Sequence, residues 1–247
     1  MPHFHDDDLV LVSPRYLAGG GGIADALGPL IHLFHWPTHH VRDRGQVTVT
    51  SPDGAVAVAF DPTRQDGVWW TVTRRQPSWS AEFTHLTPVE VIAAITQSLP
   101  QLLGDHRLID RIGALNDAPD ILTTARLNGW HYQKDPAQFT SPDGHCAVRH
   151  TPGADTPWQV THSLFDGFNT HWTATFTTAT PQPLINQFVT HLATSTPVER
   201  RYRDIPYIAR EIALITPARG GPVNAHVHHA LAHITRHTSQ PPTGRRT

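Results

Sequence analysis

One pentapeptide occurs twice in this sequence and opens a longer internal repeat. Residues 50–54 and residues 140–144 both read Thr-Ser-Pro-Asp-Gly. Four further landmarks follow in the same order in both copies, 88 to 93 residues apart: two Trp-containing segments, a Thr-Pro pair and an apolar stripe at helical spacing. Matched landmarks in one order indicate a duplicated unit. We therefore expect the chain to fold as two copies of one small structure.

The matched positions also identify the expected core. Trp70 pairs with Trp158, and Trp79 pairs with Trp172, so we assign these four rings to the interior. An amphipathic helix places residues at i, i+3 and i+7 on one face, and the stripe has this spacing. Its members are Ile92, Ile95 and Leu99 in the first copy and Ile185, Phe188 and Leu192 in the second.

Local signals predict the structure of the unit. Ser-Pro-Asp-Gly is a turn sequence, because proline sets φ and glycine accepts the positive φ that ends a tight reversal. Alternating apolar residues on both sides of this turn predict an antiparallel hairpin, and the two Trp segments predict two more strands. Thr87, followed by Pro88 and Glu90, has the pattern of a capping box. It predicts a helix that runs to about Leu103 and covers the sheet.

These elements give the expected fold class and domain boundaries. The fold is α+β: two tandem copies of an antiparallel β-meander flanked by helices, related by a pseudo-twofold axis and followed by a C-terminal helical tail. The units span residues 9–103 and 117–195, and residues 200–247 form a basic, His-rich tail that ends in disorder. A helix is expected before each sheet. In the first copy Pro29 predicts that this helix is short or broken.

Charge is distributed unevenly along the chain. The formal net charge is −2, yet residues 200–247 contain eight Arg against only Asp204 and Glu211. A basic tail on an acidic body is compatible with a polyanionic partner, and equally with a solvated tail. The single cysteine, Cys146, rules out an intramolecular disulfide and a multi-cysteine zinc site. The sequence shows no secretion signal and no 18-residue apolar run, so we expect a cytoplasmic protein without membrane contact.

The beginning of the chain adds a resemblance to a known family. Residues 13–20 read Ser-Pro-Arg-Tyr-Leu-Ala-Gly-Gly and precede two Ser-Pro-Asp-Gly sheets with Trp-containing strands. This combination resembles a streptomycete repeat family, the SPDY domain or domain of unknown function 317, over roughly residues 9–195. The resemblance implies the two-unit fold and a streptomycete, actinobacterial origin. It implies no catalytic residues.

Motifs typical of enzymes are missing from the sequence. There is no Gly-x-Ser-x-Gly nucleophile elbow, and the glycines at 19–22 lack the Gly-Lys-Ser/Thr of a nucleotide loop, so we interpret them as a flexible linker. Cys146 matches the core position Val56, which favours an inert buried thiol. We therefore expect a non-enzymatic binding protein with no cofactor.

One group of residues is a candidate nucleic-acid site. Trp69 is expected to face away from Trp70, on the same face as Arg75, where a ring could stack on a base while the arginine contacts phosphate. An edge-packed Trp beside solvated arginines is the competing interpretation. Further arginines could extend the surface, namely Arg42, Arg44 and Arg74 in the first unit and Arg200, Arg201 and Arg203 at the start of the tail.

The tail also carries a candidate metal site. His229, His233 and His237 lie four residues apart, and imidazoles at this spacing on a helix can chelate a divalent metal. Because no carboxylate or cysteine lies nearby in sequence, a solvated histidine face is the competing interpretation.

Two functional hypotheses from different classes follow. The first is binding of single-stranded or duplex nucleic acid through a sheet face and the basic tail, by analogy with other doubled sheet-and-helix folds. The acidic body argues against it, since phosphate contacts need cations. The second is a protein-interaction adaptor with no nucleic-acid contact, which fits a Thr-rich outer face of low charge.

Overall fold

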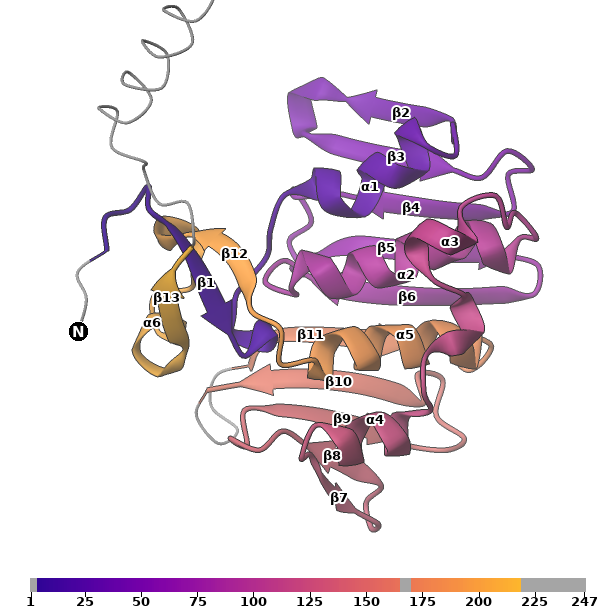
Figure 1. Ribbon diagram of the computed structural model, residues 1–247. Coiled ribbons are helices and arrows are strands. Elements are labelled where there is room, and N and C mark those ends of the chain that lie inside the picture. The colour runs from indigo at the N-terminus through magenta and orange to yellow at the C-terminus, as the bar shows by residue number, and fades with distance from the viewer. Residues whose placement is uncertain (1–3, 165–169, 219–247) are drawn as a thin grey trace, which may run out of the picture.

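The computed structural model describes residues 4–164 and 170–218, and these form an α+β fold with two antiparallel sheets (Figure 1). The larger sheet has ten strands. In spatial order they are β2 (Thr38–Val41), β3 (Gln46–Thr50), β4 (Val56–Phe60), β5 (Val68–Arg75), β6 (Ser78–Thr84), β11 (Thr170–Phe176), β10 (Trp158–Ser163), β9 (Cys146–His150), β8 (Gln138–Thr140) and β7 (His131–Gln133).

The strand order shows how the two copies meet. β6 of the first copy pairs antiparallel with β11 of the second, with Glu82 opposite Thr175. From this central pair the equivalent strands run outward in the same sequence on both sides. The two meanders therefore join into one continuous sheet, with the symmetry expected of a pseudo-twofold axis at the β6–β11 pair.

The longer helices lie together on one face of this sheet (Figure 1). The four that cover the sheet are α1 (Ile23–His32), α2 (Val89–Leu102), α4 (Ile121–Leu127) and α5 (Gln182–Ala193). The remaining helical turns are α3 (Ile109–Ile112), α6 (Ala209–Ile212), η1 (Arg15–Leu17), η2 (Arg42–Arg44), η3 (Leu115–Asp117) and η4 (Tyr202–Asp204). No helix within the described ranges is long and apolar enough to cross a membrane.

The core lies between these helices and the sheet. Phe83, Phe176 and Phe188 contact one another there, with ring centroids 5.3 to 5.8 Å apart, where the two copies meet. Of the four expected core tryptophans, Trp70, Trp79 and Trp172 are buried and Trp158 is half-buried. The predicted apolar stripes are buried as well; their members are Ile92, Ile95, Leu99, Ile185, Phe188 and Leu192.

The repeated turn has the same hydrogen bonds in both copies. Ser51 Oγ donates to Asp53 Oδ1 at 2.5 Å and accepts from the backbone N–H of Val56 at 3.0 Å. Ser141 makes the corresponding bonds at 2.6 and 2.9 Å, to Asp143 and from Cys146. The turn glycines have positive φ in both copies, +69° and +80°. The Ser-Pro-Asp-Gly sequence therefore fixes the same closed turn twice.

Two local predictions about helices are wrong. Helix α1 continues through Pro29, and the carbonyl of Asp25 that proline leaves without its helical donor accepts from Gln97 at 3.3 Å instead. The capping box does not form either, because α2 begins after Pro88 without a side-chain cap. Thr87 Oγ1 instead donates to the carbonyl of Thr173, at 3.4 Å, in the second copy.

The smaller sheet changes the interpretation of the chain ends. Its strands are β12 (Val198–Arg201), β1 (Leu9–Ser13) and β13 (Leu214–Pro217), in that order. Within the described part of the expected helical tail, residues 200–218, both ends thus pair with the first strand of the chain, through β12 and β13. Its alternating burial, with Val198 and Arg200 inside and Glu199 and Arg201 outside, is a strand pattern. Residues 219–247 lie outside the described ranges.

The N-terminal motif contacts the second copy rather than the first. Arg15 donates to the carbonyl of His191 at 2.6 Å, and the Tyr16 hydroxyl donates to Asp143 at 2.8 Å. The indole N–H of Trp172 donates to the carbonyl of Tyr16 at 3.0 Å. Residues 13–18 therefore cross from the small sheet to the second repeat.

Candidate functional sites

A β-bulge separates the predicted partners Trp69 and Arg75. Val68 pairs with Thr84 and Trp70 with Phe83, so the bulge leaves two residues of β5 opposite one of β6 and resets the alternation. Trp69 and Arg75 are also six residues apart along the strand, about 20 Å. The structure does not bring these two side chains together on one face.

Trp69 lies instead beside a cleft at the end of the strands that the first repeat contributes to the large sheet. Its ring contacts Phe60 edge-on at 6.0 Å and His85 at 5.1 Å. The cleft has a volume of about 580 Å³ and is shared with the glycine loop at residues 20–22 and with Arg200 and Arg201 of β12. Three carboxylates, Asp25, Glu199 and Asp204, also line it. The carboxylates outnumber the two arginines, so the cleft does not attract a polyanion.

The glycine loop beside this cleft is tightly packed. Gly19 has φ +73°, and a Cβ there would lie 2.7 Å from Pro206. A Cβ at Gly21 would lie 2.4 Å from a methyl carbon of Val89. The interpretation of residues 19–22 as a flexible linker is therefore wrong, because only glycine allows the loop to approach Val89 of α2 and Pro206, between η4 and α6, this closely.

The tail arginines are engaged within the protein. Arg200 is 7% exposed and forms a two-pronged ion pair with Glu90 of α2, at 2.5 and 2.7 Å. Arg203 contacts Asp7 at 2.6 Å, and Arg201 lies 3.8 Å from the same carboxylate. Arg200 therefore fastens the small sheet to the first repeat, and the other two arginines are partly neutralised.

The remaining predicted arginines lie apart from one another. Arg42 and Arg44 are exposed in η2, the turn that joins the edge strand β2 to β3. Arg74 shares the covered side of the sheet with Val56 and Trp79, its strand partners. Arg75 is exposed at the end of β5. The eight predicted residues therefore do not form one surface.

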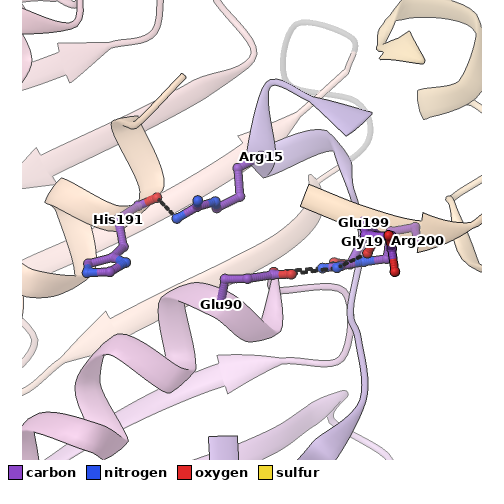
Figure 2. Close-up of polar contacts among 6 residues, drawn as sticks. All are labelled: Arg15, Gly19, Glu90, His191, Glu199 and Arg200. Carbon is purple, nitrogen blue, oxygen red and sulfur yellow. Dashed lines mark hydrogen bonds and ion pairs between the residues drawn. The ribbon is translucent and has the colours of Figure 1, made fainter. Parts of the chain in front are cut away.

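Sequence reasoning missed a cluster around Arg15, which Figure 2 shows between η1, α2 and α5. Arg15 is 7% exposed, and its Nε has no hydrogen-bond partner within the described residues. Burial lowers its pKa, Glu90 opposes this and Arg200 adds to it. The only sequence signal for this cluster is the conspicuous Ser-Pro-Arg-Tyr motif, which does not say what the arginine contacts.

The outer face of the ten-stranded sheet is the largest site candidate. Register places Thr48, Thr71, Thr73 and Ser80 on this face in the first copy. Thr161, Thr173 and Thr175 continue it in the second. Among the described strand residues, the only Arg, Lys, Asp or Glu side chains on this face are Arg75, Glu82 and Arg149.

Metal and nucleophile chemistry find no support in the described ranges. No group of three His, Cys, Asp or Glu side chains is placed there to hold a metal ion. The predicted ligands His229, His233 and His237 lie outside those ranges. Cys146 is fully buried as expected, and burial raises the pKa of its thiol well above the usual value. A thiol in that state is a poor nucleophile.

Comparison with known proteins agrees with the duplicated architecture. Residues 50–101 and 140–198 each match the SPDY family model, which describes a domain of unknown function (DUF317). Both matches begin at the repeated Thr-Ser-Pro-Asp-Gly turn. No curated protein and no solved structure matches the chain. Two regions of the chain thus match the SPDY family, which its opening motif and its doubled sheet resemble.

Proposed function

We propose that this protein is a non-enzymatic interaction module that binds a protein partner on the outer face of its ten-stranded sheet. The observation that carries the proposal is the chemistry of this face. Its side chains are mainly Thr, Ser, Ala and Gln, on a sheet whose four covering helices, α1, α2, α4 and α5, lie on the other side (Figure 1). Small side chains let another surface approach closely, and interface cores are depleted of charged residues.

The size of the face supports the same proposal. The ten strands have three to eight residues each, so at about 4.8 Å spacing and a mean length of about 17 Å they present roughly 800 Å². A stable protein–protein interface buries about 800 Å² on each partner. Because the face is hydroxyl-rich rather than apolar, it fits a partner that binds reversibly better than a permanent homodimer, whose interfaces are more hydrophobic. The partner is expected to present an uncharged, largely polar surface.

Nucleic-acid binding is less well supported by this geometry. Arg75 and Arg149 are the only Arg or Lys side chains on the outer face among the described strands, and Glu82 lies between them in the sheet. Phosphate contacts supply most of the affinity of nucleic-acid binders and require several cations. Anisotropy with labelled single-stranded DNA, duplex DNA and RNA at low salt tests this alternative directly. Micromolar binding that is lost on Arg75→Ala with Arg149→Ala would replace our proposal.

Affinity capture with matched surface variants tests the proposal itself. Thr73 and Thr161 occupy equivalent central positions on the outer face, in β5 and β10. Changing both to Arg places two bulky charges on the face. Leu122→Arg with Leu127→Arg introduces the same two side chains on exposed positions of α4, on the helical side. Circular dichroism and thermal melting confirm that both double variants fold.

We expect quantitative mass spectrometry to identify a partner protein that is captured by wild type and by the α4 variant. The same partner should be at least tenfold depleted when the Thr73 and Thr161 variant is used for capture. If wild type and the outer-face variant capture the same proteins in equal amounts, the proposal is contradicted. Loss of every partner only with the α4 variant would assign binding to the helical side instead.

A further inference from the structure

Arg15 is a buried cation, and most of its N–H donors have no hydrogen-bond partner among the described residues. A guanidinium has five N–H donors, and the described structure gives Arg15 one hydrogen bond, to the carbonyl of His191 at 2.6 Å. Its Nε has no partner among the described residues, and with the residue only 7% exposed, water has little access to it. No described carboxylate lies within ion-pair distance of it. Buried donors are nearly always satisfied, so this group needs another acceptor.

The charges around Arg15 do not balance. Glu90 acts electrostatically on Arg15, but both of its oxygens accept from Arg200 (Figure 2). The C-terminal end of α5, at His191, contributes a partial negative charge of about one half. Two guanidinium groups therefore face one carboxylate and one helix end. An incompletely compensated buried cation is unfavourable, and a bound anion would relieve it.

The space beside Arg15 has the lining that such an anion needs. A hollow of about 300 Å³ lies between Arg15 and the end of α5, lined by Thr190, Thr194 and Thr196 together with His191. Hydroxyls and a guanidinium are both donors that an oxyanion accepts from, and the Thr190 hydroxyl also lies 3.1 Å from that of Thr124. A second hollow, of about 480 Å³, adjoins Arg15 on its other side, but Asp25 and Glu90 line it and would repel an anion.

We propose that the hollow formed by Arg15, Thr190, Thr194 and Thr196 is a binding site for a small oxyanion, either a carboxylate or a phosphate group. The guanidinium would bind two oxygens of the anion through a pair of N–H donors, as arginine does with both groups. The Thr hydroxyls would complete its coordination. This site lies on the helical side of the protein, so it is separate from the interaction face on the sheet.

Thermal melting with inorganic phosphate or acetate, each compared with chloride at equal ionic strength, tests the site. For a dissociation constant of about 1 mM, 50 mM anion should raise the Tm of wild type by roughly 5 °C. Arg15→Gln removes the guanidinium and should weaken binding about tenfold or more, which reduces the shift to about half or less. Arg149→Gln removes an exposed arginine of the outer face as the matched control and should keep the full shift.

A second variant keeps the test valid even if Arg15→Gln impairs folding. Thr194→Val removes one hydroxyl and preserves side-chain shape, so the shift should become smaller while the melting remains cooperative. A shift with phosphate alone assigns a phosphorylated ligand, and a shift with acetate alone assigns a carboxylate. No shift in wild type with either anion overturns the proposal. Equal shifts in wild type, Arg15→Gln and Thr194→Val overturn it as well, since they show binding elsewhere.

Discussion

His162 makes the stability of the second repeat depend on pH. It lies in β10, 1% exposed, and its ring stacks on Trp172 with centroids 5.7 Å apart. Tyr16 and His171 contact the ring at 5.9 and 5.6 Å, and neither ring nitrogen has a hydrogen-bond partner within the described residues. Burial lowers the pKa of His162 to about 3, and His171 and His145 add to the effect while Asp143 opposes it.

The depressed pKa determines both the sign and the size of the effect. Between pH 6.5 and about 3, His162 of the unfolded chain binds a proton and His162 of the folded chain does not. Acid therefore stabilises the unfolded state, and the free energy of unfolding decreases as pH falls through this window. The linkage relation gives a loss of about 2 kcal/mol between pH 8 and pH 5 from this residue alone. Below about pH 3 the loss levels off near 5 kcal/mol.

The substitution His162→Phe isolates this contribution. Phenylalanine fills similar space against Trp172 and removes two unpaired buried nitrogens, so the stability at pH 8 should change by less than about 1 kcal/mol. Urea denaturation at pH 8 and pH 5 measures wild type and variant under identical conditions. The stability of the variant relative to wild type should rise by about 2 kcal/mol on going to pH 5.

A matched control separates this effect from the other histidines. His131→Phe removes an exposed imidazole from β7 by the same substitution, and the effect of His162→Phe is read relative to this control at each pH. If the difference between His162→Phe and wild type is constant with pH, the imidazole of His162 takes up its proton equally in the folded and the unfolded protein. The description of a neutral buried ring is then refuted.

Three further stability predictions follow from the packing of the first repeat and the two turns. Gly21→Ala places a Cβ against Val89 and should cost about 1 to 3 kcal/mol in chemical denaturation; an unchanged midpoint would refute the close contact. Glu90→Gln leaves Arg200 buried without its counter-charge and should cost about 3 to 5 kcal/mol, visible as a lower Tm, and a loss below 1 kcal/mol would mean that the pair is solvated. Ser141→Ala removes both hydrogen bonds of the second turn and should cost about 1 to 2 kcal/mol, with the equivalent change at Ser51 giving a similar loss.

The sequence predicted the elements that depend on local patterns. The Ser-Pro-Asp-Gly turns, four of the five strands of each meander and the amphipathic helices rest on turn chemistry and on apolar periodicity, which neighbouring residues encode. The two copies confirmed each other, because a repeated pattern is stronger evidence than a single one. The α+β fold class and the SPDY family followed from the same landmarks.

The errors involve contacts between distant residues. Nothing in the period of β5 marks the bulge at Trp69, so the ring was placed on the face of Arg75. Glu90 resembled a capping residue, but it pairs with Arg200, 110 positions along the chain. Pro29 is tolerated in α1 because a side chain of α2 bonds the freed carbonyl. Local patterns do not contain such partners, and the Arg15 cluster was missed for the same reason.

Site-specific photo-crosslinking tests the central claim most directly, because it reports which surface a partner touches. A photoreactive residue at Thr73 or Thr161 lies on the outer face of the sheet, and one at Leu127 lies on the helical side. We expect one protein to be crosslinked from both threonine positions and not from Leu127. If the adducts from Leu127 are the same, or if neither threonine position yields a protein adduct, the outer face is not the binding surface.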